Sequence, residues 1–390
     1  MHGNYAYVGG MSIGYRSNTN VGVRILDLTD PANPQLVSRI PLRRLGYIGD
    51  HTHGDAVATR IDSDAFQGDV AIVLNGVPDS FTPELYPMPY GVWDVTDPSV
   101  PKFLSAFQVG QWWLPLESGN LGDKPNLSKA VAGNYLFMIY DTTERAPERQ
   151  WGKTDHHMAV VDLSDPRNPV VVAKWQDTKR ATMQTLSLNK SATRAYIVGV
   201  TPPPYGTSTT HLALYVLDIS NPERPVEIGR YLHPVSRGGV YSARAVPNED
   251  GSLVILADGR WGRGGRGCNP KHLVGGVRDM GHGILHILDT SDLESIHEVS
   301  TFELPESYRC DPESEELFQA NDLAVRDNLV YSVWLNGGLH VIDISDPANP
   351  VEVAAFRSPN SLSPWLSDVA MYGDHVLATT LWSPGMYILR

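Results

Sequence analysis

The sequence predicts an all-β protein, a seven-bladed β-propeller with four-stranded antiparallel blades, formed by residues 1–390 as a single domain. Three observations predict this fold. One strand–turn–strand segment recurs six times, two further apolar runs precede the copies, and a seventh copy starts at the end of the sequence. A length of 390 residues alone would favour two or three domains, but internal repeats override that expectation.

Each copy of the repeat is an apolar run ending in Asp, a turn of the type Ser/Thr–Asp/Asn–Pro, and a second apolar run. The copies are VRILDLTDPANPQLVSRI (23–40), GVWDVTDPSVPKFLSAF (91–107), MAVVDLSDPRNPVVVAKW (158–175), LYVLDISNPERPVEIGRY (214–231), LHILDTSDLESIHEVSTF (285–302) and LHVIDISDPANPVEVAAF (339–356). The fifth copy departs from the pattern, with Leu293 in place of the turn proline. Runs of Val, Ile and Leu favour strands, and Asp before Pro favours a turn, so each copy predicts a β-hairpin. The six Asp residues that end the first runs are interpreted as caps of these turns: Asp27, Asp94, Asp162, Asp218, Asp289 and Asp343.

Two more short apolar runs before a copy complete a unit of four strands, as in residues 322–335 and 368–382. Seven units of four strands are typical of propeller blades. Residues 385–390, GMYILR, align with residues 338–343, and the seventh copy stops at its Asp position. We therefore expect the first blade to lack its innermost strand and the last blade to lack its outermost strand.

The runs VRILD, MAVVD, LYVLD and LHVID resemble the LVIVD repeat family, and the resemblance extends over nearly the whole chain. It implies a β-propeller. It carries no catalytic residues over to this sequence, and many members of the family look like surface or secreted proteins.

Composition narrows the classes of partner. Hydrophobic residues make up 42% and charged residues 19%, as in a soluble globular protein. The net charge of −13 argues against nucleic acid as a partner, and no apolar run approaches the ~18 residues of a membrane span. The first residues contain no signal peptide, so we expect a cytoplasmic protein as written, and a secreted or periplasmic one if a leader has been removed. Whether Cys268 and Cys310 pair is left open.

The segments that join the second and third strands are very unequal in length. Four of them are long, at residues 75–91, 140–157, 200–211 and 257–283, whereas the sixth blade has only a short turn. Loops on a rigid scaffold commonly carry function. The asymmetry predicts a ligand pocket at the top mouth of the central channel.

Histidines gather at the expected ends of these segments and at the expected entry to one innermost strand. His51, His53 and Asp55 stand where the innermost strand of the second blade begins, and with His157 they are the candidate catalytic residues. His51, His53, His211 and His282 are the candidate ligands of a divalent transition metal. Imidazoles also suit acid–base chemistry near neutral pH, and a short His-x-His run can be purely structural.

Substrate-binding candidates are basic and aromatic. Arg260, Arg263 and Arg266 recur every third residue in one long segment, and guanidinium groups suit carboxylates or phosphates. The alternative is that these arginines pair with the acidic residues 311–316. The aromatic candidates, which suit sugar rings, are Trp151, Tyr241, Trp261 and Trp365.

Together these features favour an enzyme that acts on a small anionic or sugar-like substrate, by histidine acid–base or metal-assisted chemistry. A lyase or a hydrolase fits, although no Gly-x-Ser-x-Gly segment supports a serine hydrolase. The alternative is a non-catalytic propeller that binds a protein partner or a polysaccharide on the same face.

Overall fold

The computed structural model describes most strands of the chain and leaves out several of the segments between them. The described residues are 1–9, 11–12, 22–41, 52–53, 56–74, 78, 90–109, 128–142, 155–177, 182–201, 211–233, 242–259, 284–305, 320–359, 365–380 and 385–390. They fall into two compact units, Met1–Gln176 and Asp177–Arg390. The expectation of one domain over residues 1–390 stays a prediction.

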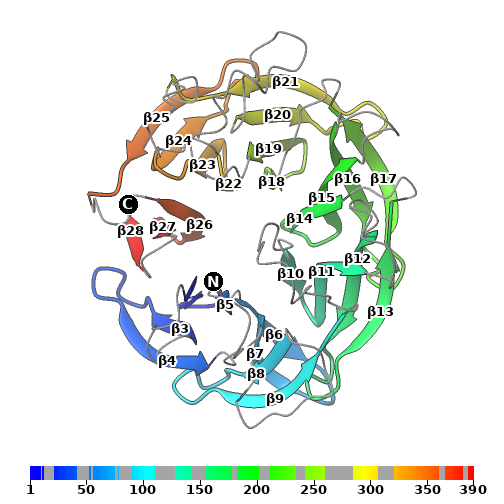
Figure 1. The fold of residues 1–390 in the computed structure, drawn as a ribbon, viewed down its shortest axis with the longest axis vertical. Coiled ribbons are helices and arrows are strands. Elements are labelled where there is room, and N and C mark those ends of the chain that lie inside the picture. The colour runs from blue at the N-terminus through cyan, green and yellow to red at the C-terminus, as the bar shows by residue number, and fades with distance from the viewer. Residues whose placement is uncertain are drawn as a thin grey trace, which may run out of the picture. The chain divides into compact units, whose positions relative to one another are not determined.

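The first unit contains three blade sheets and a small strand pair (Figure 1). The first sheet is β1 (Tyr5–Val8), β3 (Gly22–Asp27) and β4 (Gln35–Pro41). The next two sheets have four strands each: β6 (Ala56–Asp62), β7 (Gln67–Leu74), β8 (Tyr90–Asp94) and β9 (Lys102–Phe107), then β10 (Lys129–Ala132), β11 (Tyr135–Thr142), β12 (Asp155–Asp162) and β13 (Val170–Trp175). β2 (Met11–Ser12) pairs with β5 (Thr52–His53).

The second unit contains four blade sheets. Three have four strands: β14 (Thr182–Leu188), β15 (Arg194–Thr201), β16 (His211–Asp218) and β17 (Val226–Leu232); β18 (Ser242–Pro247), β19 (Leu253–Gly259), β20 (Leu285–Asp289) and β21 (His297–Phe302); and β22 (Asp322–Arg326), β23 (Leu329–Val333), β24 (Leu339–Asp343) and β25 (Val351–Phe356). The last has three: β26 (Leu366–Tyr372), β27 (His375–Thr380) and β28 (Met386–Leu389).

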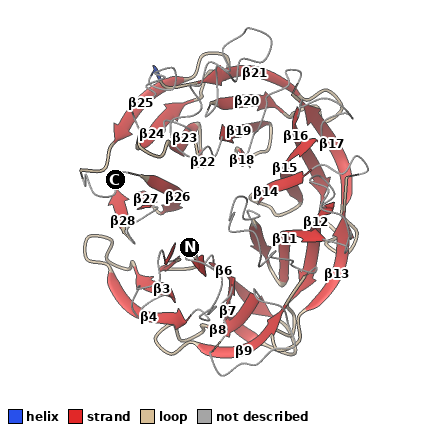
Figure 2. Ribbon diagram, viewed as in Figure 1, coloured by secondary structure: helices blue, strands red, loops and turns tan. Residues whose placement is uncertain are grey.

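The predicted fold class is confirmed: the chain is an all-β, seven-bladed β-propeller with antiparallel blades. Among the described residues, five blades have four strands, whereas the first and last have three. Within the described ranges, the first sheet begins with β1 and the last ends with β28, so each has one strand fewer than the other five, as expected. The described ranges contain no α-helix (Figure 2). The described residues accordingly form no helix that is long and apolar enough to cross a membrane.

Each repeat turn is closed by side chains, which confirms the interpretation of the repeat Asp residues as caps. Asp27 Oδ1 accepts a hydrogen bond of 2.8 Å from the backbone N–H of Thr29, and the same contact recurs in all six copies. Three residues later a second Asp or Asn caps the next turn in the same way, for example Asp30 with Ala32. This second cap forms at Asp292 as well, so Leu293 replaces the proline without loss of the turn.

Each of the six copies supplies the third and fourth strands of its blade, and these two strands always pair with one irregularity at the same place. The register shifts between the two residues before the Asp, as at Ile287/Leu288, in every copy. A bulge of this kind bends the strand and increases its twist. The repeat therefore encodes the curvature of a blade as well as its turn.

Apolar side chains of successive blades form the core within each unit. In the second unit, one cluster joins Tyr196 and Leu214 of one blade to Val254 and Leu256 of the next. Turns add polar contacts, because Ser300 Oγ on an outer strand donates to the carbonyl of Pro347 in the following blade at 2.6 Å. One copy before Ser300, the same repeat position is occupied by Gly229, which faces the turn where Leu293 replaces proline. A Cβ added to Gly229 would lie 3.0 Å from the carbonyl oxygen of Leu293.

Candidate functional site

The first strands of the blades in the second unit lie side by side in the order β14, β18, β22 and β26 (Figure 1). In propellers the first strand of each blade is the innermost one and lines the central channel. Three charged residues stand near the starts of three neighbouring first strands: Arg244 on β18, Asp322 on β22 and Asp368 on β26. We refer to them as the inner-strand group.

Arg244 and Asp322 form an ion pair between two successive blades. Arg244 Nε lies 2.7 Å from Asp322 Oδ1, at an angle that is not that of a straight hydrogen bond. The side chain of Asp322 is only 5% exposed, whereas that of Arg244 is 37% exposed. The pair thus joins a buried carboxylate to an arginine whose side chain is partly exposed.

The other oxygen of Asp322 faces the next blade. Asp322 Oδ2 accepts a hydrogen bond of 3.0 Å from the backbone N–H of Val369 on β26. Beside it, the exposed Asp368 accepts hydrogen bonds from the hydroxyls of Ser367 at 2.9 Å and Thr379 at 3.0 Å. Asp322 therefore bridges the first strands of three blades.

Burial raises the pKa of Asp322 to about 6. The Arg244 guanidinium opposes this rise and the nearby Asp368 carboxylate adds to it. A carboxyl group with a pKa near 6 exchanges protons readily near neutral pH, which is the property of a general acid or base. Its ion-pair contact with Arg244 is to Nε, and a guanidinium carries further N–H donors on its two Nη atoms. The group can therefore combine proton transfer with recognition of an anion.

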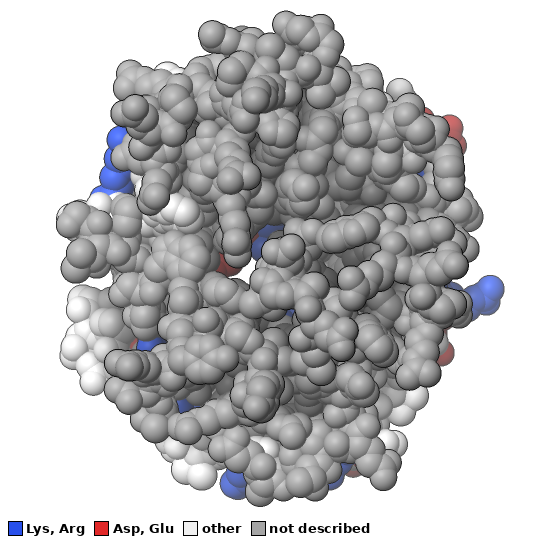
Figure 3. Space-filling view, viewed as in Figure 1, with Lys and Arg blue, Asp and Glu red and all other residues white. Residues whose placement is uncertain are grey.

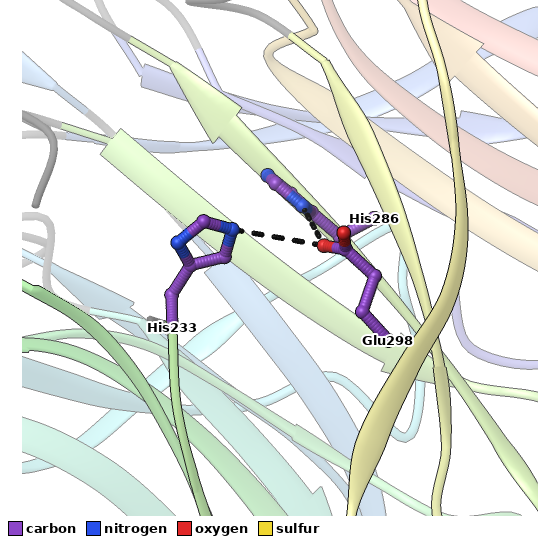
Figure 4. A group of neighbouring side chains, drawn as sticks. All are labelled: His233, His286 and Glu298. Carbon is purple, nitrogen blue, oxygen red and sulfur yellow. Dashed lines mark hydrogen bonds and ion pairs between the residues drawn. The ribbon is translucent and has the colours of Figure 1, made fainter. Parts of the chain in front are cut away.

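A second group lies between β17 and the third and fourth strands of the next blade (Figure 4). His286 Nδ1 is 2.6 Å and His233 Nε2 is 3.7 Å from the same oxygen, Glu298 Oε2. The two imidazole centroids are 5.0 Å apart, with an interplanar angle of 72°. Each residue offers one ligand atom, and these three atoms lie within 4.8 Å of one another. Two imidazoles and a carboxylate are a ligand set for Zn²⁺ or a related ion.

Strand geometry positions this histidine–glutamate group. His286 lies on β20 and Glu298 on β21, and the register shift between these strands brings the two side chains together. His233 directly follows β17, and its backbone N–H donates to the carbonyl of Leu212 at 2.9 Å. Both imidazoles are buried, with side-chain exposures of 4% for His233 and 1% for His286, and Glu298 is 30% exposed.

Two of the predicted site residues have described side chains. His211 begins β16, and its Nδ1 lies 3.0 Å from the carbonyl oxygen of His233, so it touches the histidine–glutamate group through the backbone. Trp365 is partly buried directly before β26, three residues before Asp368. The predicted metal and substrate roles of both residues remain predictions.

The other predicted site residues fall outside what the structure describes. The backbones of His53 and His157 lie in β5 and β12, but their side chains are outside the described part of the structure. The remaining ones, which stay predictions, lie outside the described residues altogether: His51, Asp55, His282, Trp151, Tyr241, Trp261, Arg260, Arg263 and Arg266.

Neither the inner-strand group nor the histidine–glutamate group was predicted from the sequence, because their residues lie in or next to runs that predict ordinary strands. A signal existed for the second group. His286 and Glu298 stand inside the fifth copy, and His340 and Glu352 stand at the same positions of the sixth. Aligning the copies would have shown the recurring pair. On the face shown in Figure 3, the visible blue and red atoms of the described residues form small separate groups.

Comparison with known proteins supports the repeat and the fold. The LVIVD repeat model matches residues 212–233 and 319–357, which confirms the resemblance seen in the sequence. A search of curated protein sequences found no match to this chain.

Solved structures with a similar fold include a hypothetical selenium-binding protein from Sulfolobus tokodaii, with a TM-score of 0.57, 11% identity and coverage of 99% of this chain and 89% of that one. Hydrazine synthase of Kuenenia stuttgartiensis has a TM-score of 0.54 and 10% identity, over 95% of this chain and 89% of that one. A Lactobacillus plantarum protein has a TM-score of 0.52 and 11% identity, over 97% and 94%. At such identities the likeness shows the fold alone.

Proposed function

We propose that this protein, an LVIVD-repeat β-propeller, binds a small anionic molecule at the starts of its first strands and transfers a proton to or from it. Arg244 binds the anion and Asp322 exchanges the proton. A carboxylate, a phosphate or a sugar acid has the required chemistry, and the proposed reaction is of the lyase or hydrolase type. The observation that carries the proposal is the buried carboxyl of Asp322, whose pKa is raised to about 6 beside a solvent-reaching arginine.

A purely structural role explains the group less well. Taking a carboxylate out of water costs several kcal/mol, and an ion pair roughly offsets that cost, so buried pairs are weak evidence for stability. Groups with shifted pKa values, in contrast, are concentrated at functional sites. The pairing of Asp322 with a partly exposed Arg244 is the arrangement expected where a ligand must reach the cation.

The position of the group also fits the predicted pocket. Ser242 at the start of β18 pairs with Gly259 at the end of β19. β19 therefore ends on the side of the sheet where β18 begins, and Gly259 is followed in the sequence by the segment that contains Arg260, Arg263 and Arg266. These three arginines remain predicted contributors to this proposed pocket, whereas the catalytic roles of His51, His53, Asp55 and His157 in the first unit stay separate predictions.

Binding and protonation are coupled in this proposal. An anion on the Nη groups of Arg244 weakens the stabilising effect of the guanidinium on the ionised form of Asp322. It also adds a negative charge nearby, and both changes raise the pKa of Asp322 further. Binding near pH 6–7 then takes up a proton, which places an acid beside the bound molecule. Release of that proton to the substrate, or its return from the substrate, is the acid–base step.

Calorimetric titration with phosphate, succinate and glucuronate, in buffers of different ionisation enthalpy, tests the proposal. We expect saturable binding of at least one of these anions with net proton uptake near pH 6.5. Arg244→Gln should weaken binding at least tenfold, and Asp322→Asn should abolish the proton uptake.

Arg326→Gln is the matched control, because Arg326 is the last residue of β22, the strand that Asp322 begins. It should leave binding unchanged. Binding that neither Arg244→Gln nor Asp322→Asn alters would reject the proposal. Saturable binding of a polysaccharide or protein to the wild type, with no response to small anions and no proton uptake, would favour the non-catalytic alternative.

A further inference from the structure

We propose that His233, His286 and Glu298 bind one divalent transition-metal ion, Zn²⁺ or an ion of similar chemistry, in a site that links two successive blades. This site is separate from the inner-strand group, and the inference does not depend on the proposed function. It rests on the distances between the ligand atoms, on their burial, and on comparison with the same positions in neighbouring blades.

The distances suit a shared ion. Two ligands at ~2.0–2.2 Å from one tetrahedral Zn²⁺ are about 3.3–3.6 Å apart. His233 Nε2 and Glu298 Oε2 are 3.7 Å apart, close to that value. His286 Nδ1 and Glu298 Oε2 are 2.6 Å apart, at hydrogen-bond distance, so a metal would take the place of the proton between them. Glu298 would move by less than about 1 Å to admit it.

The two imidazoles lie on backbone that is fixed before an ion arrives. His286 lies in β20, which is paired on both sides, with β19 and with β21. The chain at His233 is bound to Leu212 through its N–H and to the His211 ring through its carbonyl. Such fixed surroundings lower the ordering cost of metal binding. The partial exposure of Glu298, 30%, provides a route for the ion and space for a water as fourth ligand.

Repeat-related positions show that the ligand set is particular to this pair of blades. In the preceding blade the equivalents of His233, His286 and Glu298 are Asp177, Tyr215 and Glu227. There the buried Asp177 carboxylate contacts Tyr215 Oη at 3.1 Å and is neutralised by Arg230, whose Nη2 lies 2.8 Å away. An arginine thus supplies in one blade the positive charge that we assign to a metal in the next.

In the following blade the equivalents are Leu304, His340 and Glu352. The imidazole and the carboxylate recur, with His340 Nδ1 3.4 Å from Glu352 Oε2, but an apolar leucine stands in place of the third ligand. The chain therefore has a complete set of three possible ligands and, one blade further, an equivalent set that lacks the third ligand.

The experiment uses the full chain, freed of metal with a chelator and then dialysed against Zn²⁺ or, as an oxygen-preferring control, Mg²⁺. The variants are His233→Leu, which installs the residue of the following blade, and Glu298→Gln, which keeps the size of a partly exposed side chain. Glu352→Gln is the matched control at the incomplete set. Melting curves in chelator establish that each variant folds.

We expect the wild type to bind one Zn²⁺ more per chain than His233→Leu does, and Glu298→Gln to weaken that site by at least tenfold. Glu352→Gln should bind as the wild type does, Zn²⁺ should raise the melting temperature of the wild type, and Mg²⁺ should not. Co²⁺ at the site should give the visible absorption of a tetrahedral complex, which His233→Leu loses. Equal Zn²⁺ stoichiometry and affinity in wild type, His233→Leu and Glu298→Gln would overturn the inference, as would a wild type that binds none.

Discussion

Arg244 Nε on β18 lies 2.7 Å from Asp322 Oδ1 on β22, so an ion pair joins the first strands of two successive blades. The two partners differ in burial: the side chain of Asp322 is buried and that of Arg244 is partly exposed. Burial raises the pKa of the Asp322 carboxyl. Four predictions follow this relationship and the repeat geometry around it.

Stability should depend on pH through Asp322. Because the pKa of Asp322 is raised to about 6 in the folded protein, its contribution to stability is greatest below the unfolded-state pKa and is lost as pH rises towards 6. A rise of roughly two pKa units corresponds to about 3 kcal/mol. The free energy of unfolding of the wild type, minus that of Asp322→Asn, should fall by up to this amount between pH 4.5 and pH 7. Urea denaturation at both pH values measures it, and a difference that grows with pH would contradict the assignment.

Removing the cation should be costly only while Asp322 is charged. Arg244→Gln leaves a buried carboxylate without its guanidinium and should destabilise the protein by about 1–3 kcal/mol at pH 7.5. The effect should shrink at pH 5, where Asp322 is protonated. The double variant with Asp322→Asn should be more stable at pH 7.5 than Arg244→Gln alone. Strict additivity of the two changes in denaturation experiments would show that the side chains do not interact.

The turn caps should respond to loss of the acceptor oxygen and tolerate loss of the charge. Asp289 Oδ1 accepts hydrogen bonds from Ser291 N at 2.9 Å and from Ser291 Oγ, and these bonds lower the pKa of Asp289. Asp289→Ala should cost about 1 kcal/mol in thermal or chemical denaturation, whereas Asp289→Asn, which keeps an oxygen at the same place, should cost less than half as much. Equal losses in the two variants would argue against capping.

Gly229 should resist enlargement because of the irregular fifth turn. A Cβ at this position would lie 3.0 Å from the carbonyl oxygen of Leu293 and 3.1 Å from its Cβ, so Gly229→Ala should destabilise the protein by about 1–3 kcal/mol. Ser300→Ala is the control at the same repeat position one blade later, where only a hydroxyl contact is removed, and should cost about 1 kcal/mol. If the Gly229→Ala protein were as stable as the wild type, the turn at Leu293 would have to move aside at no cost in stability.

The fold could be predicted from the sequence because its determinants are local. The Asp27–Thr29 contact and its five counterparts span two residues, and the strands on either side follow from adjacent apolar runs. The register shift before each Asp is regular but was not foreseen, since nothing in the composition of Ile287 or Leu288 marks a bulge.

The candidate site depends on contacts between blades and could not be predicted in the same way. Asp322 opens a predicted apolar run, and only the packing of β22 against β18 shows that it is buried beside Arg244. The histidines and arginines that the sequence indicates, such as His282 and Arg263, belong instead to the long segments between strands. His286 and Glu298 are strand residues of the repeat, and their relation to His233 emerges when two blades are placed together.

The most direct test of the central claim is an NMR pH titration of the side-chain carboxyl carbon of Asp322, in protein labelled with ¹³C-aspartate and assigned with Asp322→Asn. We expect a midpoint near pH 6, a higher midpoint in Arg244→Gln, and an upward shift when a bound anion such as phosphate saturates the wild type. A midpoint below the ordinary aspartate value of ~3.9, unchanged by the variant and by the anion, would contradict it.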